Sequence, residues 1–146
     1  MSKYNVPADV PNELRGEFEK NMAAATAGTG HMNLFACDQK IEHLNDDFYD
    51  GGNNIPLSSN DPEHFFKIGQ ATHDAGTIGV LAGQLGLISH YARDYPNIPY
   101  LVKLNSKSHM VKTSQRDPVS QAMWDLEDVM ALIRNGINVV GIGYTV

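Results

Sequence analysis

The chain has 146 residues, 42% of them hydrophobic and 19% charged, which is enough for one folded domain with an apolar core. A formal net charge of −6 and scattered lysines exclude a basic surface for nucleic acid or an anionic membrane. The sequence shows no signal peptide and no apolar run near the ~20 residues that span a bilayer, so we expect a cytoplasmic protein. A single cysteine cannot form an internal disulfide, which favours a reducing compartment.

Residues 1–31 are predicted to form an amino-terminal arm and a helix from Pro11 to Ala27, which the glycine-rich segment 27–30 ends. Beyond it, strands and helices are predicted to alternate, separated by polar loops. The expected strands are Met32–Asp38, Thr77–Ala82, Tyr100–Asn105 and Ile137–Ile142, and the expected helices lie between Asn60 and Gly76, from Gln84 to Tyr95 and from Trp124 to Asn135.

This alternation, without a hairpin signal, predicts an α/β fold with a parallel sheet and right-handed crossovers. Two architectures fit it: an open, doubly wound sheet, or half of an eight-stranded barrel. The glycines at 76, 79, 83 and 86 do not match the dinucleotide-binding fingerprint, and the phosphate-binding P-loop pattern is missing. The motifs therefore disfavour a nucleotide-binding open sheet.

The most informative stretch is Leu34–His43, an apolar run that ends abruptly in a polar cluster beginning at Asp38. A buried parallel strand presents such side chains at its carboxyl end, where ligands bind in βα folds. The plainer alternative is an ordinary strand followed by a solvated loop. Cys37 lies inside the apolar run, which favours a buried, inert thiol over a nucleophile.

Side chains alternate along a strand, so Asp38 and Lys103 each lie near the end of a predicted strand, on a face that can point into a common interior. A lysine within an apolar strand is costly unless it is paired, and Asp38 is a suitable partner. The alternative is that Lys103 extends to solvent from an edge strand.

The remaining candidates are less specific. Asp38, Glu42 and His43 could hold a metal, but no histidine pair has ligand spacing, so a hydrogen-bonding role for His43 is favoured. Trp124 and the pair Phe65–Phe66 are predicted to belong to the core.

Three segments carry a family resemblance. Asp38–His43, with the pattern Asp-Gln-x-x-Glu-His, resembles the first-strand motif of the archaeal-type class I fructose-1,6-bisphosphate aldolases. Lys103–Asn105 resembles that family's third strand, and Asn138–Val146 resembles its glycine-rich fourth strand. The segments occur in the family's order and spacing.

The resemblance implies a (β/α)₈ TIM barrel, an enzyme that forms a Schiff base between a lysine and dihydroxyacetone phosphate, and no metal or cofactor. It implies that Asp38 shuttles a proton or orients the hydroxyl being deprotonated, and that Lys103 keeps Asp38 charged and attracts a phosphorylated sugar. Tyr144 is expected to be a hydroxyl donor, which completes the catalytic set. Gln39, His43 and Asn105 are expected to bind substrate.

A barrel of this kind needs about 250 residues, so residues 32–146 are expected to form only its first four βα units. The family's imine-forming lysine lies on the sixth strand, and the chain alone is expected to be inactive. A half barrel has bare edges and an open interior, so we expect it to pair with the remaining half or with a second copy in a homo-oligomer. The alternatives are a related phosphoketose lyase or synthase, and a non-catalytic assembly module.

Overall fold

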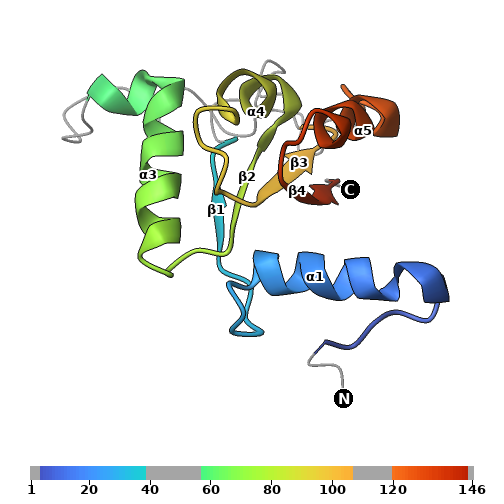
Figure 1. Ribbon diagram of the computed structural model, residues 1–146. Coiled ribbons are helices and arrows are strands. Elements are labelled where there is room, and N and C mark those ends of the chain that lie inside the picture. Colours follow the sequence, from blue (N-terminus) through green and yellow to red (C-terminus); the bar gives the residue numbers. More distant parts are fainter. Residues whose placement is uncertain (1–3, 39–56, 107–119, 145–146) are drawn as a thin grey trace, which may run out of the picture.

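The described residues form a sheet of four parallel strands that lie side by side in chain order (Figure 1). The computed structural model describes residues 4–38, 57–106 and 120–144. The strands are β1 (Leu34–Ala36), β2 (Val80–Gln84), β3 (Tyr100–Lys103) and β4 (Val139–Gly143). A doubly wound sheet reverses its strand order at a switch point. The sequential order found here is instead the order of strands around a barrel.

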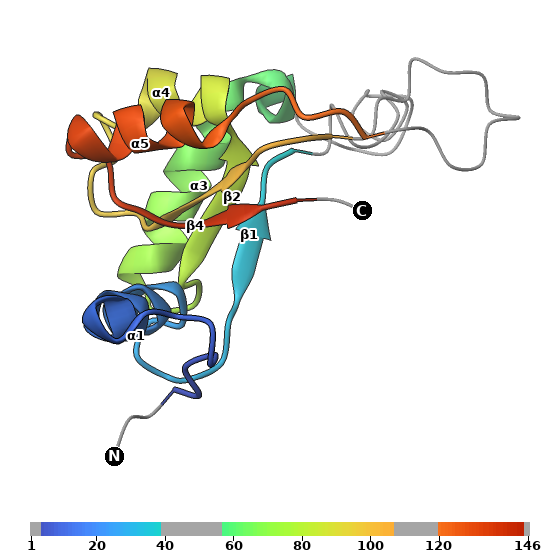
Figure 2. The ribbon, with the colours of Figure 1, turned by 90° about the vertical axis from the view of Figure 1, so that its right-hand side faces the viewer.

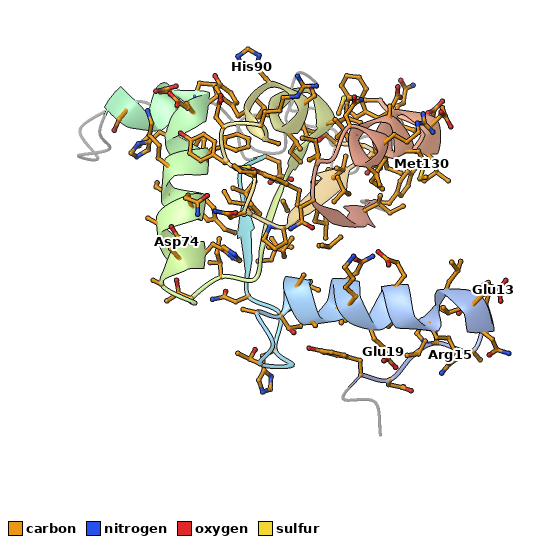
Figure 3. All side chains as sticks on the ribbon, in the orientation of Figure 1. Glu13, Arg15, Glu19, Asp74, His90 and Met130 are labelled. Atoms are coloured by element: carbon orange, nitrogen blue, oxygen red, sulfur yellow. The ribbon has the colours of Figure 1, made fainter. Side chains whose placement is uncertain are left out.

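The helices that connect the strands lie on one side of the sheet (Figures 1 and 2). They are α3 (Pro62–Asp74), α4 (Leu85–Tyr91) and α5 (Leu126–Arg134). Figure 3 shows His90 on the outer surface of α4, with Asp74 of α3 and Met130 of α5 toward opposite ends of this helical layer. Helices on a single side leave the other side of the sheet, which we call the inner face, to line an interior.

The core fills the space between these helices and the sheet. Leu81 and Val102 project from the strands, and Cys37 from the position after β1, into a cluster that also contains Phe66 of α3 and Ile88 of α4. The rings of Tyr91, Tyr95 and Tyr100 surround Phe66 with centroid separations of 5.0, 5.8 and 6.2 Å. Phe66 is completely buried, and Phe65 and Trp124 are partly buried against the same cluster, so their assignment to the core is confirmed.

Helix α1 (Arg15–Ala25) lies near the amino-terminal ends of the strands, following a 3₁₀ turn at Asn12–Leu14 (Figure 1). Its last turn approaches Gly79, where a Cβ atom would lie 1.9 Å from the carbonyl oxygen of Ala25. Only glycine permits this contact. The helix ends with the backbone hydrogen bonds of a Schellman motif, Gly28 to Ala23 and Ala27 to Ala24, which is the end predicted at segment 27–30.

Several predicted boundaries are wrong by a few residues. The second strand runs from Val80 to Gln84 rather than from Thr77 to Ala82, because the β2 ladder to β3 continues through Gln84. The next helix starts at Leu85 and ends at Tyr91, and Tyr95 precedes a proline, which disfavours helix.

The final helix starts at Leu126 rather than Trp124, because Asp125 caps it. The Asp125 side chain accepts a hydrogen bond from the Asp128 backbone, and the Asp128 side chain accepts one from the Asp125 backbone. None of the helices in the described ranges is long and apolar enough to cross a membrane.

Candidate active site

The carboxyl ends of the first three strands hold an unusual concentration of buried polar side chains. Five polar or charged residues are buried in the described part of the chain, and four of them lie here: Asp38, Gln84, Asn105 and Ser106. The fifth, Thr26, follows α1. Buried polar groups are costly unless they are satisfied or functional, so this end of the sheet is the candidate active site.

The strand register places the key residues in one row across the inner face. Gln84 pairs with Lys103, and Lys103 pairs with Gly143. On the other flank, Ala36 pairs with Ala82 and the ladder continues through Cys37, which places Asp38 level with Gln84. Since side chains alternate along a strand, Asp38, Gln84 and Lys103 share the inner face.

Asp38 and Lys103 form an ion pair in this row, with 2.6 Å between Lys103 Nζ and Asp38 Oδ2. The Lys103 side chain is 14% exposed and the Asp38 side chain is 10% exposed. The predicted pairing inside the fold is therefore confirmed. The alternative of an edge-strand lysine reaching solvent is wrong, because β3 lies between β2 and β4.

Gly143 gives the lysine stem room to lie along the inner face. A Cβ atom at Gly143 would lie 2.8 Å from Leu101 Cδ2 and 3.5 Å from Lys103 Cγ. Any larger residue would push the neighbouring side chains of β3 aside. The glycine-rich fourth strand thus makes space for a charged group that would otherwise be crowded.

Cys37 points to the opposite face from Asp38. Its thiol is buried and donates to the carbonyl oxygen of Ala82 at 3.0 Å. Burial, and secondarily the charge of Asp38, raise the pKa of Cys37 to about 12. A thiol with this pKa is protonated at neutral pH, so the expectation of a buried, inert cysteine is confirmed.

The other predicted site residues are not all brought to the pair. Asn105 is fully buried, and its side-chain amide donates to the Ser120 carbonyl at 3.3 Å, which ties the end of β3 to the segment before α5. Tyr144 is 57% exposed and follows Gly143, so alternation places it on the opposite side from Lys103. Gln39 and His43 lie outside the described residues.

A metal centre has no support in the part of the chain that can be described, where no three His, Cys, Asp or Glu side chains are grouped to hold an ion. Glu42 and His43, two of the three ligands considered above, lie outside it. The chemistry that the described site supports is that of a buried carboxylate held beside an ammonium group. Such a carboxylate can exchange protons with a substrate, and the ammonium can attract an anionic one.

Sequence reasoning missed Gln84 and Ser106. The Gln84 side chain donates from Nε2 to Ser106 Oγ, and both residues are buried. The sequence pattern predicts that Gln84 begins the following helix, and this prediction hides its place at the end of a strand. A polar residue two positions after Ala82, on the same face of the same apolar run, was the available signal.

A comparison with known protein families shows the family to which the chain belongs. The family described as DeoC/LacD family aldolase matches residues 32–146. The chain belongs to this family of aldolases.

Three individual proteins to which the chain is similar are all named as fructose-bisphosphate aldolases. A fructose-bisphosphate aldolase/6-deoxy-5-ketofructose 1-phosphate synthase of Methanocaldococcus jannaschii is 48% identical over 142 residues, covering 97% of this chain and 43% of that protein. The structure of a fructose-bisphosphate aldolase from Slackia heliotrinireducens is 55% identical, with a TM-score of 0.87 over 99% of this chain and 43% of the other. A Schiff-base-forming fructose-1,6-bisphosphate aldolase is 26% identical, with a TM-score of 0.63 over 88% of this chain and 44% of the other.

These matches confirm the predicted fold class. The chain spans less than half the length of the relatives it matches, and its four sequential parallel strands correspond to half of a TIM barrel.

Proposed function

We propose that this chain supplies the amino-terminal half of a class I aldolase that reversibly cleaves fructose 1,6-bisphosphate to dihydroxyacetone phosphate and glyceraldehyde 3-phosphate. The observation that carries the proposal is the buried Asp38–Lys103 ion pair at the carboxyl ends of the strands, in a chain 48% and 55% identical to fructose-bisphosphate aldolases. TIM-barrel enzymes place their catalytic groups at this end.

The chemistry divides between the two halves of the barrel. A lysine of the remaining half attacks the ketone carbon, water leaves, and a protonated imine forms. Asp38 accepts the proton of the C4 hydroxyl as the C3–C4 bond breaks, and the imine takes up the electron pair released at C3. Lys103 holds the carboxylate in place and adds positive charge for the phosphorylated sugar. This route needs no metal or cofactor.

A second activity has a specific observation in its favour. The Methanocaldococcus relative is named both as an aldolase and as a 6-deoxy-5-ketofructose 1-phosphate synthase. Transfer of the dihydroxyacetone unit to another carbonyl acceptor would use the same imine and the same carboxylate. We therefore propose a related phosphoketose synthase as the alternative activity of the site.

The apolar surface along α5 and β4 supports pairing with the remaining half. Leu126, Met130 and Ile133 are 61%, 45% and 42% exposed, and Ile142 is 47% exposed. With Asn21 of α1 and other residues they line a hollow of about 320 Å³. We propose that the next βα unit of the barrel covers this surface, and that the closed barrel works in a reducing, cytoplasmic compartment as a homo-oligomer.

The test uses a completed barrel, in which residues 1–146 replace the equivalent part of the Slackia aldolase. Borohydride reduction with dihydroxyacetone phosphate should label one lysine outside residues 1–146, because reduction turns the imine into a stable amine. The 146-residue chain alone should not be labelled. Mass spectrometry locates the label, and labelling of Lys103 in either protein would contradict the division of chemistry proposed above.

The same completed barrel tests Asp38. Asp38→Asn should retain borohydride labelling but lower kcat by about 10²–10⁴-fold, since an amide cannot accept the proton. Asp94→Asn, at an exposed residue between α4 and β3, is the matched control. An effect of Asp38→Asn confined to KM would reduce Asp38 to a binding residue. A folded completed barrel without cleavage activity would overturn the proposed function.

A further inference from the structure

Gln84 lies at the end of β2, within the candidate active site. Its Nε2 atom donates to Ser106 Oγ, while its buried Oε1 atom has no hydrogen-bond partner among residues 4–38, 57–106 and 120–144. The residue as a whole is only 4% exposed. Buried carbonyl oxygens without a partner are rare in folded proteins, and each one calls for a physical reason.

The register shows where this amide sits relative to the ion pair. β2 lies between β1 and β3, so Asp38 approaches from one flank of β2 and Lys103 from the other. Their charged atoms are 2.6 Å apart, so the pair spans the end of β2, where Gln84 is the last residue. A Cβ atom at Gly83 would lie 2.9 Å from Cys37 Sγ and 3.8 Å from Ile88 Cγ1, so this position faces the core and the next residue, Gln84, faces the inner side.

A substrate that can reach the Asp38–Lys103 ion pair can also reach Gln84. Asp38 and Lys103 are themselves 10% and 14% exposed as side chains, so a substrate that reaches them enters the same buried end of the sheet. Gln84 occupies the same level of the row, on the strand between them. A ligand positioned for proton exchange with Asp38 therefore passes within reach of Gln84.

We propose that Gln84 is a substrate-binding residue whose Oε1 atom accepts a hydrogen bond from a hydroxyl group of the phosphorylated sugar. This inference rests on the proposed function and adds a specificity determinant to it. The bond between Gln84 and Ser106 holds the amide in a fixed orientation, with the oxygen directed away from Ser106. A site built to bond a hydroxyl discriminates against ligands that lack one.

The test measures binding rather than turnover, in the completed barrel defined above. The probes are mannitol 1,6-bisphosphate, which carries hydroxyl groups, and hexane-1,6-diol bisphosphate, which has the same phosphates and chain length without them. Gln84→Met keeps the side-chain length but removes the acceptor. It should weaken binding of the mannitol probe by about 10-fold, the order of one hydrogen bond, and leave the hexanediol probe unchanged.

Gln70→Met is the matched control, because it makes the same substitution in helix α3, where the Gln70 side chain donates to Asp74 on the exposed surface. It should leave binding of both probes unchanged. If Gln84→Met weakens both probes equally, Gln84 acts only through the structure or through Lys103, and the inference is wrong. The inference also fails if neither probe is affected. If the folded, unsubstituted barrel binds neither probe, the proposed function itself fails.

Discussion

Replacing Lys103 with methionine should be among the most destabilising single changes in the sheet. The substitution keeps the stem that lies beside Gly143 but leaves the Asp38 carboxylate, 10% exposed, without its ammonium partner. At 2.6 Å and an effective dielectric constant of about 20, the two charges attract each other by roughly 6 kcal/mol. Removing both from water costs several kcal/mol per ion, so the intact pair adds little net stability.

Removing one member of the ion pair lowers the free energy of unfolding more than replacing both members does. An uncompensated buried charge typically costs about 3–5 kcal/mol, whereas replacing both members with apolar groups is often nearly neutral. We therefore expect Lys103→Met to lower the free energy of unfolding by about 3–5 kcal/mol. The double variant Lys103→Met/Asp38→Leu should recover at least half of that loss.

Urea denaturation of the completed barrel and its variants measures these differences through the transition midpoint. The matched control is Lys67→Met, which breaks a 2.9 Å ion pair with Glu63 whose side chains are 54% and 38% exposed. Solvent screens that pair, so its loss should leave the midpoint nearly unchanged. The reasoning is refuted if Lys103→Met lowers the midpoint no more than Lys67→Met does. It is also refuted if the double variant loses as much unfolding free energy as Lys103→Met and Asp38→Leu lose together when measured singly.

Two further predictions concern stability. Because the pKa of Cys37 is raised from 9.0 to about 12 by burial, its neutral thiol contributes stability that is complete below about pH 9 and is lost as pH rises toward 12. Urea midpoints measured across this range should fall less steeply for Cys37→Ala than for the parent, and identical slopes would contradict the assignment. Ala27 has a φ of 47° at the end of α1, so Ala27→Gly should stabilise the protein by roughly 1 kcal/mol. Ala24→Gly, inside the same helix, should instead destabilise it by about 0.5–1 kcal/mol, and equal effects of the two changes would rule out strain at Ala27.

The pairing of Asp38 with Lys103 was predictable because it depends on only two local facts. Strand alternation has a period of two, and an unpaired lysine in an apolar strand is too costly to persist. Neither fact requires knowledge of which strands are neighbours. The position of Cys37 inside the apolar run likewise predicted a buried thiol, and the thiol is buried.

Gln84 could not be assigned in this way, because nothing local separates the end of β2 from the start of α4. The chain passes from strand to helix between Gln84 and Leu85 without a loop, and glutamine is a good helix former. What places Gln84 in the sheet is its pairing with Lys103, nineteen positions along the chain on a different strand. Boundaries that depend on such long-range pairing are set by the assembled sheet. At this position that boundary also determines whether the residue belongs to a helix surface or to the row beside Asp38.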